Sequence, residues 1–198
     1  MATEKDRLDA KNHWEEFYHS TSPGKVSWYQ ENPATSLDFI EKTGLPKEAP
    51  ILDVGSGAST LVDQLLLRGY RNLALLDVST KALLLTRQRL GGKATGVAWH
   101  HGDVTRYSLP EQYSLWHDRA AFHFLVDPSD RRAYITSLRQ GLRPQGHLIL
   151  ATFAVGGPTK CSGLDVVQYD TQKITTELGQ NFRLIETLEE LHQTPAGV

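Results

Sequence analysis

The chain has 198 residues, of which 39% are hydrophobic, and this length supports one substantial hydrophobic core but not two, so we expect a single domain spanning residues 1–198. A formal net charge of −2 gives no broad basic field, which argues against nucleic acid or an anionic membrane surface as the partner. The single cysteine, Cys161, excludes a disulfide within the chain and favours a reducing, cytoplasmic location.

The first predicted elements are a helix over Glu4 to His19, a loop, and a short helix over Ala34 to Lys42. We interpret residues 1–45 as a helical lid and residues 46–198 as a Rossmann-like core. Short apolar runs predict strands at residues 50–54, 72–77, 96–101, 113–118 and 147–153. Helical spacing predicts helices at residues 59–68, 79–90, 129–142 and, more weakly, 170–178.

Capping residues indicate where the helices begin and end. We expect Ser79 and Ser129 to be N-caps, and Gly69 and Gly91 to end helices at their C-termini. Strands separated by helices cannot pair as hairpins, so the sequence predicts an α/β fold with a doubly wound, mostly parallel sheet and helices on both faces. We expect residues 154–163 to form a mobile loop.

The end of the chain carries a further strand pattern. Residues 182–192 predict a sixth strand, and residues 194–197 predict a turn toward an antiparallel partner. The expectation from this pattern is that the final antiparallel strand of the sheet is missing. The incomplete edge also supports a hypothesis in which the domain is a non-catalytic binding module.

The stretch ILDVGSGAST, residues 51–60, places two glycines directly after the first predicted strand. Gly55 and Gly57 permit positive φ and let a ligand approach the backbone closely. A dinucleotide fingerprint requires a third glycine where this chain has Thr60. Asp53 would repel an anionic pyrophosphate, so a ligand with a cationic amino or sulfonium group suits the loop better. These residues disfavour a nicotinamide-dependent dehydrogenase.

Two more carboxylates follow successive strands. Asp77 ends the second strand about 20 residues after the glycines, a spacing typical of a ribose-binding acid. Asp103 follows the third strand, where its carboxylate can accept from an adenine amino group. The alternatives are a helix N-terminal charge for Asp77 and a turn cap for Asp103. Carboxylates at the ends of three successive strands favour a shared ligand site.

Taken together, LDVGSGAS, LLDVS and HGDV resemble the first three motifs of the class I (seven-stranded, Rossmann-like) S-adenosylmethionine-dependent methyltransferases. The resemblance covers about residues 10–195 and is closest in motif to the lysine and thiopurine-type branches. It implies S-adenosylmethionine as the cofactor. It implies that the methionine end is held by Asp53, Gly55, Ser56 and Gly57, the ribose and adenine by Asp77 and Val78, and the adenine edge by Asp103 and Val104.

The acceptor side is expected after the fourth strand, in the segment WHDRAAFHFL at residues 116–125. Methyl transfer from a sulfonium requires placement, exclusion of water and an uncharged nucleophile more than acid–base catalysis. Asp118 could orient an amine or accept its proton, Arg119 could pair with Asp118 or an acidic acceptor, and His117 completes the candidate catalytic set. The alternative is a structural Asp–Arg pair and structural histidines. Ala120 stands where the resembling families often have glycine.

Aromatic residues before the core are the other candidates. In the resembling family, residues matching Trp14 and Tyr18, and a following pair here Trp28 and Tyr29, fold over the cofactor, where an aromatic face attracts a sulfonium. The alternative is that the aromatic residues of the first predicted helix only pack that helix against the sheet. We expect no metal site, because the adjacent pair His100 and His101 points to opposite faces of a strand.

The leading hypothesis is methyl transfer by direct displacement to an amine, thiol or similar small-molecule nucleophile. The alternatives are a protein-lysine methyltransferase and a non-catalytic cofactor-binding module. We expect no nucleic-acid or membrane partner, a monomer or weak dimer, and a soluble cytoplasmic protein without a secretory signal.

Overall fold

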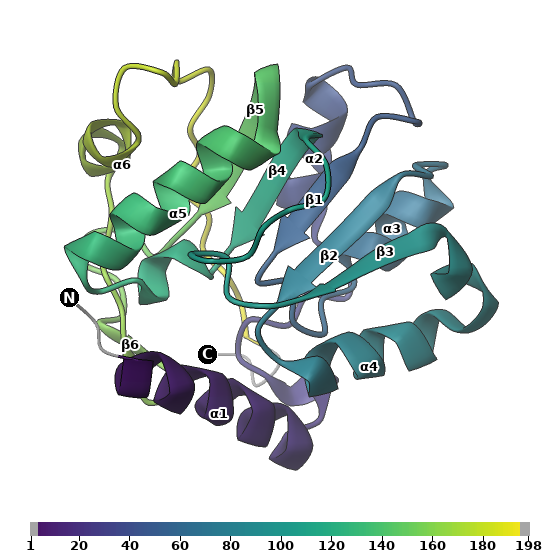
Figure 1. Cartoon of the computed structure of the whole chain (residues 1–198), viewed down its shortest axis with the longest axis horizontal. Helices are drawn as coiled ribbons and strands as arrows, with labels where there is room; N and C mark the ends of the chain where they lie inside the picture. Colours follow the sequence, from purple (N-terminus) through teal and green to yellow (C-terminus); the bar gives the residue numbers. More distant parts are fainter. Residues whose placement is uncertain (1–3, 195–198) are drawn as a thin grey trace.

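A five-stranded parallel sheet forms the centre of the computed structural model, which describes residues 4–194, with side chains from residue 8 onward (Figure 1). Its strands are β1 (Ile51–Val54), β2 (Leu73–Asp77), β3 (Val97–His101), β4 (Tyr113–Arg119) and β5 (Leu142–Ala151). The strand order is β3-β2-β1-β4-β5, and every neighbouring pair is parallel. The order reverses between β1 and β4, which confirms the doubly wound α/β fold and places the ligand crevice at their carboxyl ends.

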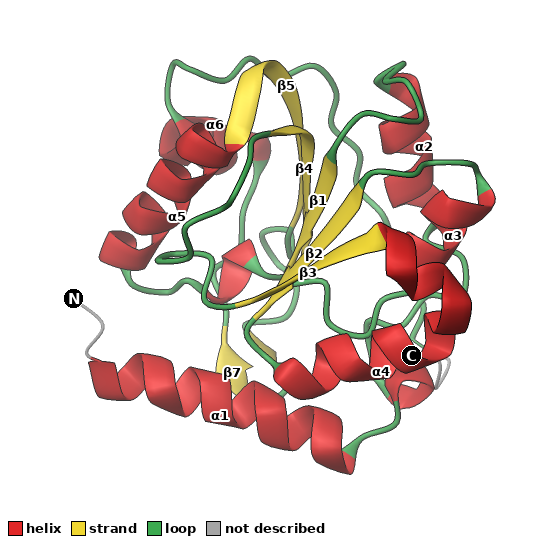
Figure 2. Ribbon diagram, turned by 45° about the vertical axis from the view of Figure 1, so that its right-hand side comes forward, coloured by secondary structure: helices red, strands yellow, loops and turns green. Residues whose placement is uncertain are grey.

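Helices cover both faces of the sheet (Figure 2). The α-helices are α1 (Glu4–Ser20), α2 (Ala34–Lys42), α3 (Leu61–Leu67), α4 (Thr80–Leu90), α5 (Pro128–Gly141) and α6 (Thr171–Leu178). Short 3₁₀ turns lie at Pro23–Lys25, Gly91–Gly96 and Phe122–Phe124. Helices α2, α3 and α4 share one face and α5 and α6 the other, while α1 lies across the carboxyl ends of the strands (Figures 1 and 2).

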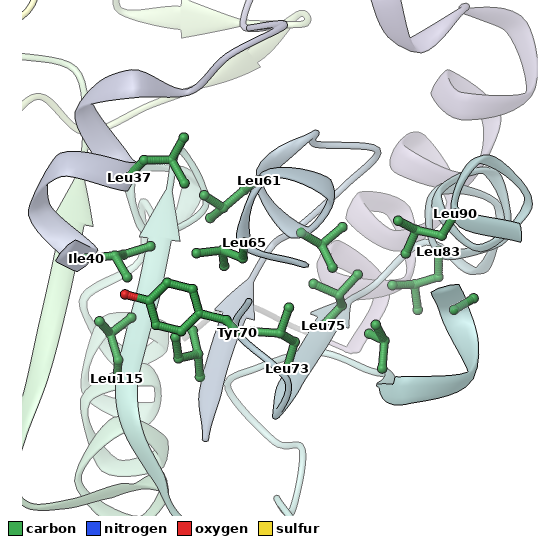
Figure 3. Packing of buried hydrophobic residues seen from close by; sticks show 14 residues of the cluster. Leu37, Ile40, Leu61, Leu65, Tyr70, Leu73, Leu75, Leu83, Leu90 and Leu115 are labelled. Carbon is green, nitrogen blue, oxygen red and sulfur yellow. The ribbon is translucent and has the colours of Figure 1, made fainter. Parts of the chain in front are cut away.

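Each face of the sheet has its own apolar core. On the α2–α3–α4 face, Leu37 and Ile40 of α2 pack with Leu65 of α3 and Leu115 of β4, and the Tyr70 ring lies among them (Figure 3). On the other face, Trp116 of β4 donates its indole N–H to Tyr134 of α5 at 2.9 Å. Strands buried on both faces explain why β1 and β2 are continuous apolar runs in the sequence.

The expected helix ends are partly confirmed. Ser79 caps α4, since its hydroxyl oxygen accepts from the Ala82 N–H at 3.1 Å. Gly91 ends α4 with φ of 56°, as expected of a C-terminal glycine. The expectation for Ser129 is wrong, because Asp127 caps α5 and Pro128 occupies the first turn. The first residue of a helix has no partner for its backbone N–H, so the missing N–H of Pro128 costs nothing there. Proline at this position therefore favours a helix that begins at residue 128.

Strand β5 begins at Leu142 rather than at His147, because α5 runs directly into it. The pairing with β4 carries a register shift between Tyr113 and Leu115, and Gln145 adopts a φ of 62°. This irregular first half lacks apolar alternation, which is why the sequence pattern missed it.

The predicted strand at residues 182–192 is wrong. That segment has neither helix nor strand, and Leu184, Ile185 and Leu188 are each more than half exposed, so these apolar side chains form no buried strand face. Its charged side chains bind other segments instead: Glu186 pairs with Lys42 at 2.7 Å. Residues 195–197 of the predicted turn lie outside the described residues.

The expected mobile loop at 154–163 contains the first strand of a small antiparallel hairpin. Strands β6 (Lys160–Cys161) and β7 (Leu164–Asp165) pair through Ser162 and Gly163, both with positive φ. The hairpin is too short for a sequence pattern to reveal. Within residues 4–194, no helix combines the length and apolarity that crossing a bilayer requires.

Candidate active site

A cavity of about 470 Å³ lies at the carboxyl ends of the central strands. Its walls come from the ends of β1, β2 and β4, from α1 and from the β6–β7 hairpin. The residues that the sequence assigned to cofactor binding all line it, namely Trp28, Tyr29, Asp53, Gly55, Ser56, Gly57, Asp77, Val78, Asp103 and Val104. Of the three acceptor-side candidates, His117 and Arg119 line the cavity and Asp118 does not.

The glycine loop is packed tightly against two other segments. Gly55 and Gly57 have φ values of 60° and 53°, the left-handed region that glycine adopts without strain. A Cβ at Gly55 would collide with Ala121 after β4, and a Cβ at Gly57 would collide with the Tyr18 hydroxyl of α1. The two glycines therefore serve contacts within the protein as well as leaving room for a ligand.

Asp77 organises the end of β2. Its Oδ2 accepts from the Gly57 N–H at 2.7 Å, and its Oδ1 accepts from the Ser79 N–H at 2.8 Å. Burial raises the pKa of Asp77 to about 6, against the lowering effect of these two backbone hydrogen bonds. Asp77 thus also has the alternative role that the sequence offered, a charge beside the N-terminus of a helix, here α4. It lines the cavity as well.

Asp103 occupies a similar place after β3. Its Oδ1 accepts from the backbone N–H and the hydroxyl of Thr105, at 2.9 and 2.8 Å. Asp103 is therefore the turn cap that the sequence offered as the alternative, and it lines the cavity together with Val104 and Val78.

A buried chain of three side chains crosses the cavity floor. His117 Nδ1 lies 2.7 Å from Asp53 Oδ1, and His117 Nε2 lies 2.9 Å from the Ser36 hydroxyl of α2. Asp53 and His117 are register partners on β1 and β4, which explains their contact. All three side chains line the cavity with 6% exposure or less.

The structure corrects the role expected of Asp118. Alternation along β4 points His117 and Arg119 to one face and Asp118 to the other. Asp118 is fully buried there, accepting from the Ala121 and Phe122 N–H groups at 2.9 and 3.2 Å and from the Tyr134 hydroxyl at 2.7 Å. It shapes the turn after β4 and cannot orient a substrate in the cavity.

Arg119 does not pair with Asp118, because the two side chains leave opposite faces of β4. Its Nη1 donates to the Trp28 carbonyl at 3.0 Å, which ties β4 to the loop before α2. Burial lowers the pKa of Arg119. Burial, followed by the nearby Arg119 charge, lowers the pKa of His123 to about 4, so that histidine is neutral beside the Phe153 ring on which it stacks.

Ala120, where the resembling families have glycine, has a φ of 71°. This left-handed conformation is costly for a residue with a Cβ, which gives a physical reason for glycine at this position. The turn after β4 is therefore formed here by a strained alanine.

The N-terminal aromatics form one cluster over the cavity. Trp14 contacts Trp28 and Phe124 edge to face, with ring centroids 5.9 and 5.0 Å apart, and Phe17 stacks on Trp28 at 5.4 Å. Trp14, Trp28 and Phe124 line the cavity. The sequence offered two roles for these aromatic residues, holding α1 against the core and covering the ligand, and the rings are placed for both.

Four hydrogen bonds around the site were not anticipated from the sequence. Glu15 of α1 accepts from the Ser79 hydroxyl at 2.7 Å and from the Lys81 N–H at 3.1 Å. Thr60, at the position of the absent third glycine, donates to the Gln30 carbonyl at 2.7 Å. Ser36 meets His117 across 81 residues of sequence. Such long-range pairs leave no local pattern. Within the described residues, no group of three His, Cys, Asp or Glu side chains could hold a metal ion.

Known proteins with similar sequences are methyltransferases. The family model described as "Methyltransferase domain" matches residues 51–146. These matches support the assignment of the chain to the class I S-adenosylmethionine-dependent methyltransferases. EEF1A lysine methyltransferase 2 of Danio rerio is 25% identical over 163 residues, covering 74% of this chain and 69% of that protein. The eEF1A lysine and N-terminal methyltransferase of Mus musculus is 26% identical over 160 residues, covering 77% of this chain and 21% of that protein.

Solved structures of low sequence identity share the fold. The glycopeptide N-methyltransferase MtfA complexed with sinefungin gives a TM-score of 0.54 at 24% identity, covering 65% of this chain and 57% of that chain. A structure reported for the conversion of a disulfide bond into a thioacetal group during echinomycin biosynthesis gives 0.62 at 22% identity, covering 73% and 59%. The chain thus spans less than two thirds of these solved structures.

The residues of the cavity fit the family's cofactor, S-adenosylmethionine. The Ser56 hydroxyl is buried at the glycine loop and has no hydrogen-bond partner within the described residues, so a polar ligand group can satisfy it. Glycines at 55 and 57 keep the loop free of side chains. Asp53, Asp77 and Trp28 also line the cavity, and they would offer carboxylates to an amino group and a ribose and an aromatic face to a sulfonium.

Proposed function

We propose that this chain binds S-adenosylmethionine in the cavity and transfers its methyl group by direct displacement to an amine, thiol or similar nucleophile of a small molecule. One observation carries the proposal: a single cavity of about 470 Å³ joins the cofactor-binding residues to the acceptor-side residues His117 and Arg119. Residues of α1 and of the β6–β7 hairpin also line it, and such a concave, partly enclosed cavity suits a small acceptor.

In this proposal the cofactor spans three strand ends, those of β1, β2 and β3. The glycine loop, with Asp53 and the free Ser56 hydroxyl, holds the methionine end. Asp77 with Val78 holds the ribose and adenine, and Asp103 with Val104 borders the adenine edge. Trp28 and Tyr29 face the sulfonium from the lid. The acceptor lies toward His117 and Arg119, with Asp118 supporting the turn from outside the cavity.

Calorimetric titration with S-adenosylmethionine tests the first step. We expect the wild-type chain to bind, and Asp77→Ala to weaken binding sharply because the ribose loses its acceptor. Asp38→Ala, on the exposed side of α2, is a matched control and should bind as the wild type does. A wild-type chain that binds no cofactor would refute the proposal.

Cofactor carrying a labelled methyl group, added to a lysate that is then divided into protein and small-molecule fractions, tests the second step. Label in the small molecules supports the proposal. Label confined to protein supports the second candidate, a protein-lysine methyltransferase, which is favoured by the names of the curated relatives. Binding without transfer to either fraction supports a non-catalytic module.

We further propose that residues 1–45 act as a lid on a core of residues 46–198, and that the protein works in the cytoplasm as a monomer or weak dimer without nucleic-acid partners. The single, half-buried Cys161 and the balanced net charge support this view.

A further inference from the structure

Three polar side chains on separate elements form a continuous hydrogen-bonded line into the cavity. Asp53 of β1 contacts His117 Nδ1 at 2.7 Å, and His117 Nε2 contacts the Ser36 hydroxyl at 2.9 Å. A carboxylate only accepts hydrogen bonds, so Nδ1 carries the proton and Nε2 is left to accept from Ser36. Ser36 is therefore the member of the line whose oxygen can in turn accept from a ligand.

Burying three polar groups in this way is costly unless each is fully hydrogen-bonded. The Ser36, Asp53 and His117 side chains are 6%, 5% and 2% exposed. The cluster does not simply fill the apolar core of that face, since all three residues line the cavity where substrate would lie. A network kept at such cost beside a reaction site is a candidate for moving a proton.

We infer that Ser36, His117 and Asp53 form a proton relay that deprotonates the acceptor nucleophile, an inference that rests on the proposed function. An ammonium acceptor gives its proton to Ser36 Oγ while the Ser36 hydroxyl proton passes to His117 Nε2. The N–H electron pair stays on the acceptor nitrogen and forms the new bond to the methyl carbon. S-adenosylmethionine supplies that methyl group, and its sulfur keeps the electron pair of the broken bond and leaves as a neutral thioether.

The imidazolium produced is stabilised by Asp53, and its proton returns to solvent after the products leave. The other charges near His117 are Arg119, two residues along the same face of β4, and Asp118 on the opposite face. Glu190 of the C-terminal segment acts on Arg119 and offsets its charge. Of these charges, Asp53 and Asp118 attract an imidazolium at His117 and Arg119 repels it.

Single-turnover transfer of labelled methyl groups to the small-molecule lysate fraction tests the relay over a pH range spanning neutrality. We expect Ser36→Ala and His117→Gln to slow transfer about 10²-fold at neutral pH, the usual contribution of a general base. The deficit should shrink as pH rises, because the acceptor then loses its proton without help. For Ser36→Ala, which leaves the Asp53–His117 contact in place, the calorimetric Kd for S-adenosylmethionine should match the wild type.

His100→Gln is the matched control, because His100 is a buried strand histidine whose two ring nitrogens bind tyrosine hydroxyls outside the cavity. It should keep the wild-type rate. A second measurement needs no acceptor: ¹⁵N spectra of histidine-labelled protein, with His117→Gln assigning the signal, should show neutral His117 protonated at Nδ1.

Several results would overturn the relay. A deficit that is the same at every pH indicates a structural role, and weaker cofactor binding in Ser36→Ala indicates a cofactor-holding role. A His117 ring protonated at Nε2, or charged at neutral pH, removes the base. A wild-type enzyme that binds cofactor but labels no acceptor refutes the proposed function and the relay together, whereas wild-type transfer with pH-independent deficits refutes the relay alone.

Discussion

The Glu15 carboxylate accepts a 2.7 Å hydrogen bond from the Ser79 hydroxyl, which joins helix α1 to the first turn of α4. The same Ser79 donates its backbone N–H to Asp77, whose other oxygen accepts from Gly57. The helix that roofs the cavity is thereby connected to the strand end and loop that line it. Although burial raises it, hydrogen bonds from Lys81 and Ser79 lower the pKa of Glu15 overall, so the contact persists at neutral pH.

Removing this contact should loosen the roof. We expect Glu15→Ala to release bound S-adenosylmethionine about tenfold faster, since a hydrogen bond to a charged group contributes about 1.5–3 kcal/mol. Stopped-flow displacement measures the rate. The neighbouring, exposed Glu16→Ala is the control and should release cofactor at the wild-type rate. Equal rates in both variants would show that α1 is held by its aromatic contacts alone.

Cofactor affinity should depend on pH through Asp77. Its pKa is raised from 3.8 to about 6, so it gains a proton as pH falls through about 6 and then accepts ribose hydroxyls less well. We expect the calorimetric Kd of the wild type to rise as pH drops from 7 to 5. Asp77→Asn should bind more weakly at neutral pH and show a flatter dependence over that interval. A wild-type affinity independent of pH would contradict the assignment.

Asp118 should matter for stability rather than for binding. Asp118→Ala leaves the Ala121 and Phe122 N–H groups and the Tyr134 hydroxyl without their acceptor, which should cost about 1–3 kcal/mol in urea unfolding. Because its side chain points away from the cavity, the Kd for cofactor should stay at the wild-type value. A tenfold loss of affinity with unchanged stability would restore the role expected from the sequence.

Alanine substitutions at Gly57 and Gly69 distinguish the effect of a steric collision from the effect of backbone strain. Both have positive φ, but a Cβ at Gly57 meets the Tyr18 hydroxyl, whereas a Cβ at Gly69 meets nothing within 4 Å. We expect Gly69→Ala to cost about 1 kcal/mol and Gly57→Ala to cost more and to weaken cofactor binding. Tyr18→Phe should recover part of the loss in the double variant. Equal costs at the two positions would show that α1 adapts freely.

Ala120 offers the reverse change. Its φ of 71° strains a side chain that carries a Cβ, so Ala120→Gly should raise the free energy of unfolding by up to about 1 kcal/mol. Ala121 has a φ of −107°, so Ala121→Gly should lower stability by about 0.5–1 kcal/mol. Thermal unfolding of the two variants measures both changes in stability. If Ala120→Gly is less stable than the wild type, the restricted backbone freedom of alanine contributes more to stability than relief of the strain does.

Local patterns predicted most of the sheet and its helices. The apolar runs that became β1 and β2 are buried on both faces, so their composition alone identifies them. The same reasoning failed at residues 182–192, where apolar residues such as Leu184, Ile185 and Leu188 resemble those of a strand but the segment pairs with no strand of the sheet. A strand pattern shows only that a segment could bury one face of a strand. Whether the segment forms a strand depends on pairing with another strand in the tertiary structure.

The sequence by itself determined the strand ends at which the cofactor-binding residues lie, because parallel strands bring Asp53, Asp77 and Asp103 to one edge through local spacing alone. Only the tertiary structure decided which side chains share the cavity. Alternation along β4 admits His117 and turns Asp118 away, and packing of α2 brings Ser36 to His117. Contacts between distant residues depend on how helices pack on the sheet, a physical outcome that no local pattern records.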